Sequence, residues 1–211
     1  MKYSNRQHDI NIDNRVRYIL NSIYNFENIH YIRAPNRNFD IHGVDVIIRS
    51  KRTYSLMWVD EKCAAHYWDK DLNTFSCELT CNKTKNGLGW FAQENNKFSS
   101  TTHYMFVWIR AFEQELIHLD SVELMLVNKY DLQKYFNLCI GCDTNTSTIE
   151  LIDKVLGNNR WIQFNSDIKI KRCDIYPEFP VNVIFSKELL QNLSIWHKVY
   201  DKDYINKVMK I

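Results

Sequence analysis

The apolar positions near the start of the chain follow a helical period. They repeat at i, i+3, i+4 and i+7, the spacing of one helix face, at Val16, Ile19, Leu20 and Ile23. Asp13 stands before this stripe and is a residue type favoured at helix N-caps. Pro35 disfavours helical geometry in the residue before it. The pattern therefore predicts an amphipathic helix from Asp13 to about Asn25, followed by a short strand at 31–33.

Beyond this helix, runs rich in β-branched and aromatic residues predict strands. The predicted strands cover 44–49, 54–62, 75–81, 102–109, 122–127 and 181–185, and 161–173 is predicted to be extended. Helical spacing predicts further helices at 130–138, 148–156 and 189–200. This order of elements predicts one α/β or α+β domain over residues 1–211, with a central mixed β-sheet flanked by helices.

Composition narrows the class of protein. Hydrophobic residues make up 45% of the 211 residues and charged residues 25%, as in an ordinary globular protein. The net charge of +2 is small, so any phosphate-binding surface must be a local patch. The chain shows no stretch of 18 apolar residues and no apolar core near its start, so we expect a cytoplasmic location and no membrane partner.

The six cysteines allow two interpretations. The pairs Cys77-x3-Cys81 and Cys139-x2-Cys142 would supply four thiolates to a structural zinc ion in an interaction protein. Alternation within FSCELTC instead predicts a strand that buries Cys77. Without an export signal, reduced and buried thiols are the favoured interpretation.

The candidate chemistry lies in the predicted hairpin GVDVIIRSKRTYSLMWVDEK. Because side chains alternate along a strand, Asp60 and Lys62 share one face, while Glu61 faces away and is expected to contribute little. Asp45 opens the neighbouring strand, and two carboxylates this close repel each other unless a cation lies between them. Magnesium or manganese ions bind carboxylate, water and phosphate oxygens. The hairpin therefore predicts a metal site at Asp45 and Asp60, with Lys62 orienting a nucleophile and neutralising developing charge.

This arrangement resembles the motif of the PD-(D/E)XK nuclease superfamily, also called restriction-endonuclease-like. The motif is an aspartate on one strand, followed on the next strand by an acidic residue, any residue and a lysine. Asp45 matches the first position, and the triplet from Asp60 to Lys62 matches the second. The leading helix and the strands over about 13–110 are similar to the αβββ core of that family. The resemblance implies a restriction-endonuclease-like fold and a magnesium-dependent hydrolase, an endonuclease or exonuclease that cleaves phosphodiester bonds of DNA.

The chain also departs from the family pattern. Val44 stands where the family name has proline, and Asp40 competes with Asp45 for the first acidic position. The segment after Lys62 shows no convincing amphipathic helix, although the family core ends with a helix and a strand. A non-catalytic module that binds nucleic acid or protein, with this or another α/β fold, therefore stays as the alternative.

Further site residues are expected from the resemblance and from residue type. Family members often add an acidic residue from the first helix, or a Glu or Gln from farther along the chain; the best candidate is Glu78, and the weaker ones are Glu27 and Gln93. The candidates for nucleic-acid contacts are Arg49, Lys51, Arg52, Lys83, Lys85 and Trp90. The basic side chains would contact phosphates, and the indole of Trp90 would stack on bases or pack in the core. A homodimer is compatible with this prediction.

Overall fold

The computed structural model describes residues 6–34, 43–51, 53–82, 87–92, 100–141, 156–157, 159–173 and 180–209. The elements, in chain order, are α1 (Arg6–Phe26), β1 (His30–Arg33), β2 (Val46–Arg49), β3 (Leu56–Cys63), the 3₁₀ turn η1 (Ala65–Tyr67), β4 (Thr74–Asn82), β5 (Gly87–Leu88), β6 (His103–Ala111), β7 (Leu119–Asn128), α3 (Lys129–Ile140), β8 (Trp161–Gln163), β9 (Ile168–Arg172), β10 (Val181–Ser186), α5 (Lys187–Leu193), β11 (Ser194–Asp201) and α6 (Lys202–Met209). The fold is α+β, and its strands form two sheets.

The larger sheet has six strands in the order β1-β2-β3-β6-β7-β11. All of its neighbours are antiparallel except β3 and β6, which run parallel. The predicted central mixed sheet is therefore confirmed. Parallel neighbours require a crossover connection. Between β3 and β6 the chain leaves this sheet and forms η1, β4 and β5.

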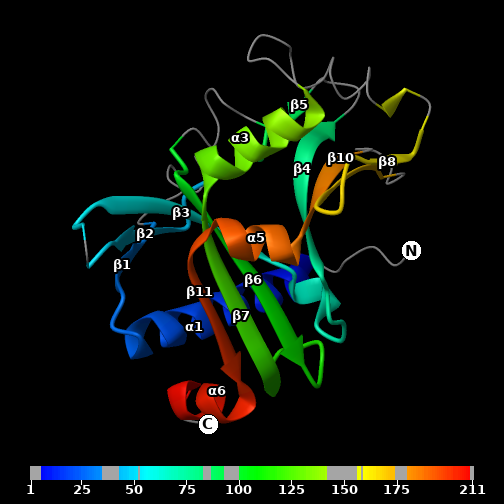
Figure 1. The fold of residues 1–211 in the computed structure, drawn as a ribbon. Coiled ribbons are helices and arrows are strands. Elements are labelled where there is room, and N and C mark those ends of the chain that lie inside the picture. The colour runs from blue at the N-terminus through cyan, green and yellow to red at the C-terminus, as the bar shows by residue number, and fades with distance from the viewer. Residues whose placement is uncertain are drawn as a thin grey trace.

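The smaller sheet has five strands in the order β5-β4-β10-β9-β8 and covers one face of the larger sheet, together with α3 and α5. Helices α1 and α6 cover part of the opposite face. Figure 1 shows β6, β7 and β11 side by side, with α1 crossing them and with β4 and β10 forming a separate layer. The sequence predicted β4, β6, β7 and β10 as strands but did not separate them into two sheets.

Strand β6 explains why the sheet is covered on both faces. Its even-numbered residues pack against the smaller sheet: Tyr104, Phe106 and Trp108. Its odd-numbered residues pack toward α1: Met105, Val107 and Ile109. All six side chains are buried, so this strand has the nearly continuous apolar run of a strand that is covered on both faces.

The predicted start of the first helix is wrong. Helix α1 begins at Arg6 rather than at Asp13, which lies within the helix. The apolar stripe extends back to Ile12, which is 4% exposed, so packing against the sheet continues the helix past a residue that only resembles a cap.

The predicted helix at 189–200 is correct only as far as Leu193, where α5 ends, and is wrong beyond it. Ser186 caps the short helix α5 by accepting a hydrogen bond from the backbone N–H of Leu189 at 3.1 Å, and the chain then becomes strand β11. This strand pairs with β7 along its length, and its β-branched and aromatic residues fit that pairing.

Residues 161–173 form the hairpin β8–β9 rather than one extended segment, and the helix predicted at 148–156 lies almost entirely outside the described residues. No helix in the described part of the chain has the length and apolar character needed to span a membrane.

Candidate active site

A polar cavity of about 440 Å³ lies beside the start of β2, where β3 extends past its last partner on β2 toward η1. Helix α1 forms one of its walls. The residues that line it are Ile12, Asp13, Val16, Arg17, Gly43, Asp45, Asp60, Glu61, Lys62, Cys63, Ala65 and His66. The structure therefore brings Asp45, Asp60 and Lys62 together around one cavity.

Asp45 is fixed by the strand beside it. Its backbone N–H donates to the carbonyl of Val59 at 2.9 Å, and its Oδ2 accepts a hydrogen bond from the backbone N–H of Glu61 at 2.8 Å. Glu61 lies beyond Val59, which pairs with Val46 at the start of β2, so no residue of β2 pairs with the Glu61 N–H. The carboxylate satisfies the donor in place of a strand partner, which explains its fixed position.

Asp60 and Lys62 form an ion pair within the same strand. Lys62 Nζ lies 2.8 Å from Asp60 Oδ1 and 4.5 Å from the ring centroid of Trp90. The indole of Trp90 is half-buried and makes edge contacts with Tyr104 and Phe91. The predicted base-stacking residue therefore packs beneath the candidate lysine, where it holds the ammonium by a cation–π contact.

Asp60 is a deeply buried carboxylate of the cavity. It is only 2% exposed, and its Oδ2 has no hydrogen-bond partner among the described residues. Burial raises the pKa of Asp60 to about 7; the Asp45 carboxylate also raises it, and the Lys62 ammonium opposes the rise. The arrangement thus holds a carboxylate oxygen without a partner beside a second carboxylate.

Glu61 faces away from this pair, as the strand alternation predicts, but it has a larger role than expected. Its carboxylate accepts hydrogen bonds from Tyr24 Oη at 2.7 Å and from Arg33 Nη1. Arg33 also donates from Nε to Asn21 Oδ1 at 2.7 Å. Burial raises the pKa of Glu61, while Arg33 opposes the rise. This network joins α1, β1 and β3, and thereby fixes the strand whose N–H holds Asp45.

The cavity also contains residues that sequence reasoning missed or set aside. Asp13 and Arg17 enter it from α1, one helical turn apart on the same side. His66 enters it from η1. Burial raises the pKa of Asp13, and His66 opposes that rise. The i, i+4 spacing places Asp13 and Arg17 on one side of a helix, but Asp13 is also a typical cap residue, and a cap at this position would not belong to that side.

The predicted additional acidic residues are not brought to this cavity. Glu78 lies on β4 in the smaller sheet, and its neighbour Cys77 faces the core with 0% exposure. Glu27 lies after α1, where its carboxylate accepts from Tyr204 Oη at 2.7 Å. Neither glutamate is among the described residues that line the cavity.

The predicted nucleic-acid contacts are also distributed elsewhere. Arg49 and Lys51 lie at the opposite end of β3, where they line a different cavity. Arg49 pairs with Leu56 on β3, and Leu56 is six positions from Lys62, which corresponds to about 20 Å along a strand. Several predicted residues lie outside the described residues: Asp40, Arg52, Lys83, Lys85 and Gln93.

The structure describes one cysteine side chain from each of the two predicted pairs. Cys77 is a buried free thiol, as the alternation predicts, and burial raises the pKa of this thiol well above its ordinary value. Cys139 is a half-buried free thiol on α3, while Cys142 and the side chain of Cys81 lie outside the described part of the structure.

The donor set of the cavity fits a hard cation such as magnesium. Among the described side chains, no three His, Cys, Asp or Glu residues gather closely enough to hold a metal by themselves. Magnesium commonly takes one or two carboxylates and fills its other positions with water and phosphate oxygens. Asp45 and the unpartnered Oδ2 of Asp60 supply such a pair.

Comparison with known proteins adds no assignment: no family model, no curated protein and no solved structure matches this chain.

Proposed function

We propose that this protein is a metal-dependent nuclease that hydrolyses phosphodiester bonds, with DNA as the substrate. One observation carries the proposal: Asp45, Asp60 and Lys62 line one polar cavity in which a buried carboxylate oxygen of Asp60 has no partner among the described residues. Burying such a group is costly, and a bound cation compensates that cost.

The topology supports a restriction-endonuclease-like core. Helix α1 is followed by β1, β2 and β3, and the two strands of the motif are antiparallel neighbours. Strand β3 then has a parallel neighbour, β6, as a crossover core requires. The crossover contains η1 and strands of the smaller sheet where the family has a helix, which accounts for the missing helical pattern after Lys62.

Each residue of the proposed site has a role that follows from its position. Asp45 and Asp60 would hold a magnesium or manganese ion, which when bound polarises the scissile phosphate and lowers the pKa of a coordinated water. Lys62 presents an ammonium at the edge of the cavity and donates hydrogen bonds to a phosphate oxygen or to the attacking water. Trp90 restrains that ammonium from below.

Asp13, Arg17 and His66 complete the wall on the helix side. Asp13 takes the position of the acidic residue that family members contribute from the first helix. Arg17 and His66 offer hydrogen-bond donors to phosphates on either side of the scissile bond. DNA is proposed as the substrate on the strength of the resemblance.

A cleavage assay tests the proposal. Supercoiled plasmid and linear DNA are incubated with the purified protein and magnesium or manganese, beside Lys62→Met. The matched control is Lys187→Met, because Lys187 also pairs with a carboxylate, Glu123 at 2.9 Å, and also lies over an indole, that of Trp108 at 4.9 Å. We expect Lys62→Met to lose at least about 100-fold in rate, as for the loss of a transition-state contact, and Lys187→Met to cleave as the wild type does. Equal cleavage by all three proteins would refute the role of Lys62.

The alternative function is a non-catalytic binding module. It is favoured by the Asp60–Lys62 ion pair, in which the two charges satisfy each other without a metal. Calorimetric titration with manganese separates the two functions, because the nuclease requires a saturable site that Asp45→Ala and Asp60→Ala each remove. A wild-type protein that shows neither saturable binding nor cleavage would leave the binding module as the better description.

A further inference from the structure

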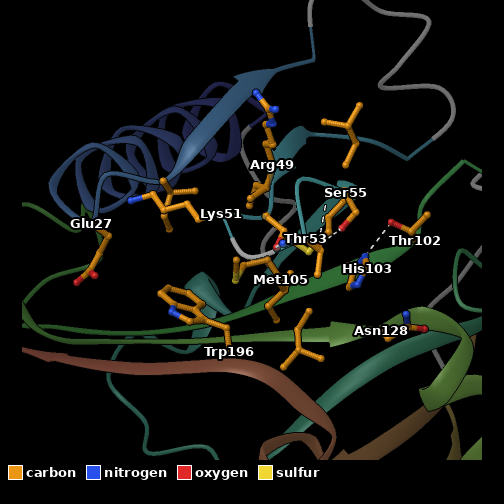
Figure 2. A pocket seen from close by; sticks show the side chains of 17 residues that line it. Glu27, Arg49, Lys51, Thr53, Ser55, Thr102, His103, Met105, Asn128 and Trp196 are labelled. Carbon is orange, nitrogen blue, oxygen red and sulfur yellow. Dashed lines mark hydrogen bonds between the residues drawn. The ribbon is translucent and has the colours of Figure 1, made fainter.

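A second cavity, of about 790 Å³, lies on the same face of the larger sheet as α1, beyond the C-terminal end of that helix. Helices α1 and α6 leave this part of the face uncovered. Figure 2 shows the cavity, with Glu27 at one end, Asn128 at the other, and Met105 and Trp196 between them. Its volume lies within the range of pockets that hold small molecules, about 300–1,000 Å³.

The floor of the cavity is apolar and is built from all but the first strand of the sheet. Its apolar lining residues are Ile29, Ile48, Leu56, Met57, Met105, Leu126, Ile195 and Trp196. Most of them belong to the hydrophobic core between α1, α6 and the larger sheet, or pack against it, so the floor is a continuation of that core. Leu56 and Ile195 remain 56% and 58% exposed. An apolar body that entered the cavity would remove this surface from water.

The rim near the β2–β3 turn is positively charged. Arg49 and Lys51 line it and lie across the cavity from Trp196 in Figure 2. Glu27, at the far end, is already engaged by Tyr204 Oη at 2.7 Å and by Lys198 Nζ at 3.4 Å. The charges available to a ligand on the described rim are therefore cationic.

The remaining polar groups around the rim carry no formal charge. Thr53 and Ser55 lie in the turn, and Thr102 and His103 lie at the start of β6. Burial lowers the pKa of His103, which favours the neutral imidazole, while Asp131 opposes this shift. These groups offer hydrogen bonds to the polar end of a ligand, while Arg49 and Lys51 select the sign of its charge.

We propose that this cavity binds an amphipathic small-molecule anion, with its aromatic or aliphatic body on the Met105–Trp196 floor and its acidic group at Arg49 and Lys51. The apolar floor argues against a highly charged ligand that lacks an apolar body, because such a ligand would leave the floor in water. The cationic rim argues against a neutral hydrocarbon, because that ligand would desolvate the charges without compensation. This inference is independent of the nuclease proposal, since no described residue lines both cavities.

Two matched probes test the inference. The first is 1-anilinonaphthalene-8-sulfonate, and the second is N-phenyl-1-naphthylamine, which has the same aromatic body without the sulfonate. Both are titrated into the full chain by fluorescence. We expect one site for each probe and about tenfold tighter binding of the sulfonate, the effect of two partly exposed cations.

Variants assign the binding to this cavity. Arg49→Gln/Lys51→Gln should weaken the sulfonate probe about tenfold and leave the neutral probe unchanged, whereas Lys134→Gln/Lys202→Gln, which removes the same charge elsewhere, should alter neither. Met57→Trp should fill the cavity and weaken both probes, and Leu138→Trp on the exposed side of α3 should not. Circular dichroism and thermal melting verify that each variant is folded.

The outcomes separate clearly. Equal affinity for the two probes, or an unchanged sulfonate affinity in Arg49→Gln/Lys51→Gln, would overturn the anionic ligand class. Binding that Met57→Trp and Leu138→Trp affect equally would overturn the location. A failure here leaves DNA cleavage untouched, because Lys62 lines the other cavity.

Discussion

Replacing Asp60 with asparagine should change the pH dependence of stability in a direction that the burial of this residue fixes. A carboxyl group whose pKa is higher in the folded than in the unfolded protein contributes stability that is complete below the unfolded pKa. That contribution is lost as the pH rises through the folded pKa. For Asp60 these two values are 3.8 and about 7. Asparagine has nearly the same shape and does not ionise, so Asp60→Asn should not show this loss.

The magnitude follows from the two pKa values. At about 1.4 kcal/mol for each pH unit, the difference between 3.8 and about 7 corresponds to about 4 kcal/mol over the whole range. Between about pH 4.5 and about pH 8, about 3 kcal/mol of this amount should appear. The wild type should lose about 3 kcal/mol of unfolding free energy over this pH range through Asp60, and Asp60→Asn should not. The unfolding free energy of Asp60→Asn minus that of the wild type should therefore increase by about 3 kcal/mol from about pH 4.5 to about pH 8.

Urea unfolding at the two pH values measures this quantity, with magnesium-free buffers so that ion binding does not contribute. Comparing the change between pH values cancels the pH-independent effect of losing the ion pair with Lys62. Asp69→Asn, at an exposed position, reports the effect of removing a carboxylate in general. A difference between Asp60→Asn and the wild type that is the same at both pH values would refute the argument that the pKa of Asp60 is raised in the folded protein.

Two further substitutions test the surroundings of the site. Arg33→Met should lower the free energy of unfolding by about 3 kcal/mol, because it leaves the buried Glu61 carboxylate without its cation. The double variant Arg33→Met/Glu61→Gln should recover part of this loss, as measured by chemical denaturation. A loss in the double variant that equals or exceeds that of Arg33→Met would contradict the ion-pair argument. Gly89→Ala should lower the free energy of unfolding by about 1–3 kcal/mol, because the added Cβ would lie 2.3 Å from the backbone oxygen of Glu78. The control is Ser76→Ala, at an exposed position of β4. Equal melting temperatures for the two variants would contradict the close approach.

The candidate site could be predicted from the sequence to the extent that it depends on local geometry. Asp60 and Lys62 are two residues apart on one strand, and Asp45 precedes the neighbouring strand of a hairpin, so alternation and a short connection suffice to bring them together. Asp13 and His66 reach the same cavity only through the packing of α1 and η1. That packing depends on which sheet face each element covers, and no local pattern determines this.

The fold shows the same division. Residues 122–127 and 181–185 were correctly predicted as strands, but their pairing places them in different sheets. The segment 194–201 has spacing that also suits a helix, and pairing with β7 decides in favour of a strand. Long-range hydrogen bonding overrides the local preference at such positions.

The hydrogen bond from the Glu61 N–H to Asp45 has a consequence for how a metal would be held. That bond occupies Oδ2 of Asp45, and the ammonium of Lys62 occupies Oδ1 of Asp60. Under the proposed function, Asp60 would offer an ion its Oδ2, which no described residue contacts, while Asp45 would bind the ion with one carboxylate oxygen partly engaged by the strand. A magnesium ion held there would draw its other ligands from water, main-chain carbonyls and phosphate, as this ion commonly does. If the protein acts on nucleic acid as proposed, a substrate phosphate would supply part of that coordination, and ion and nucleic acid would then bind cooperatively.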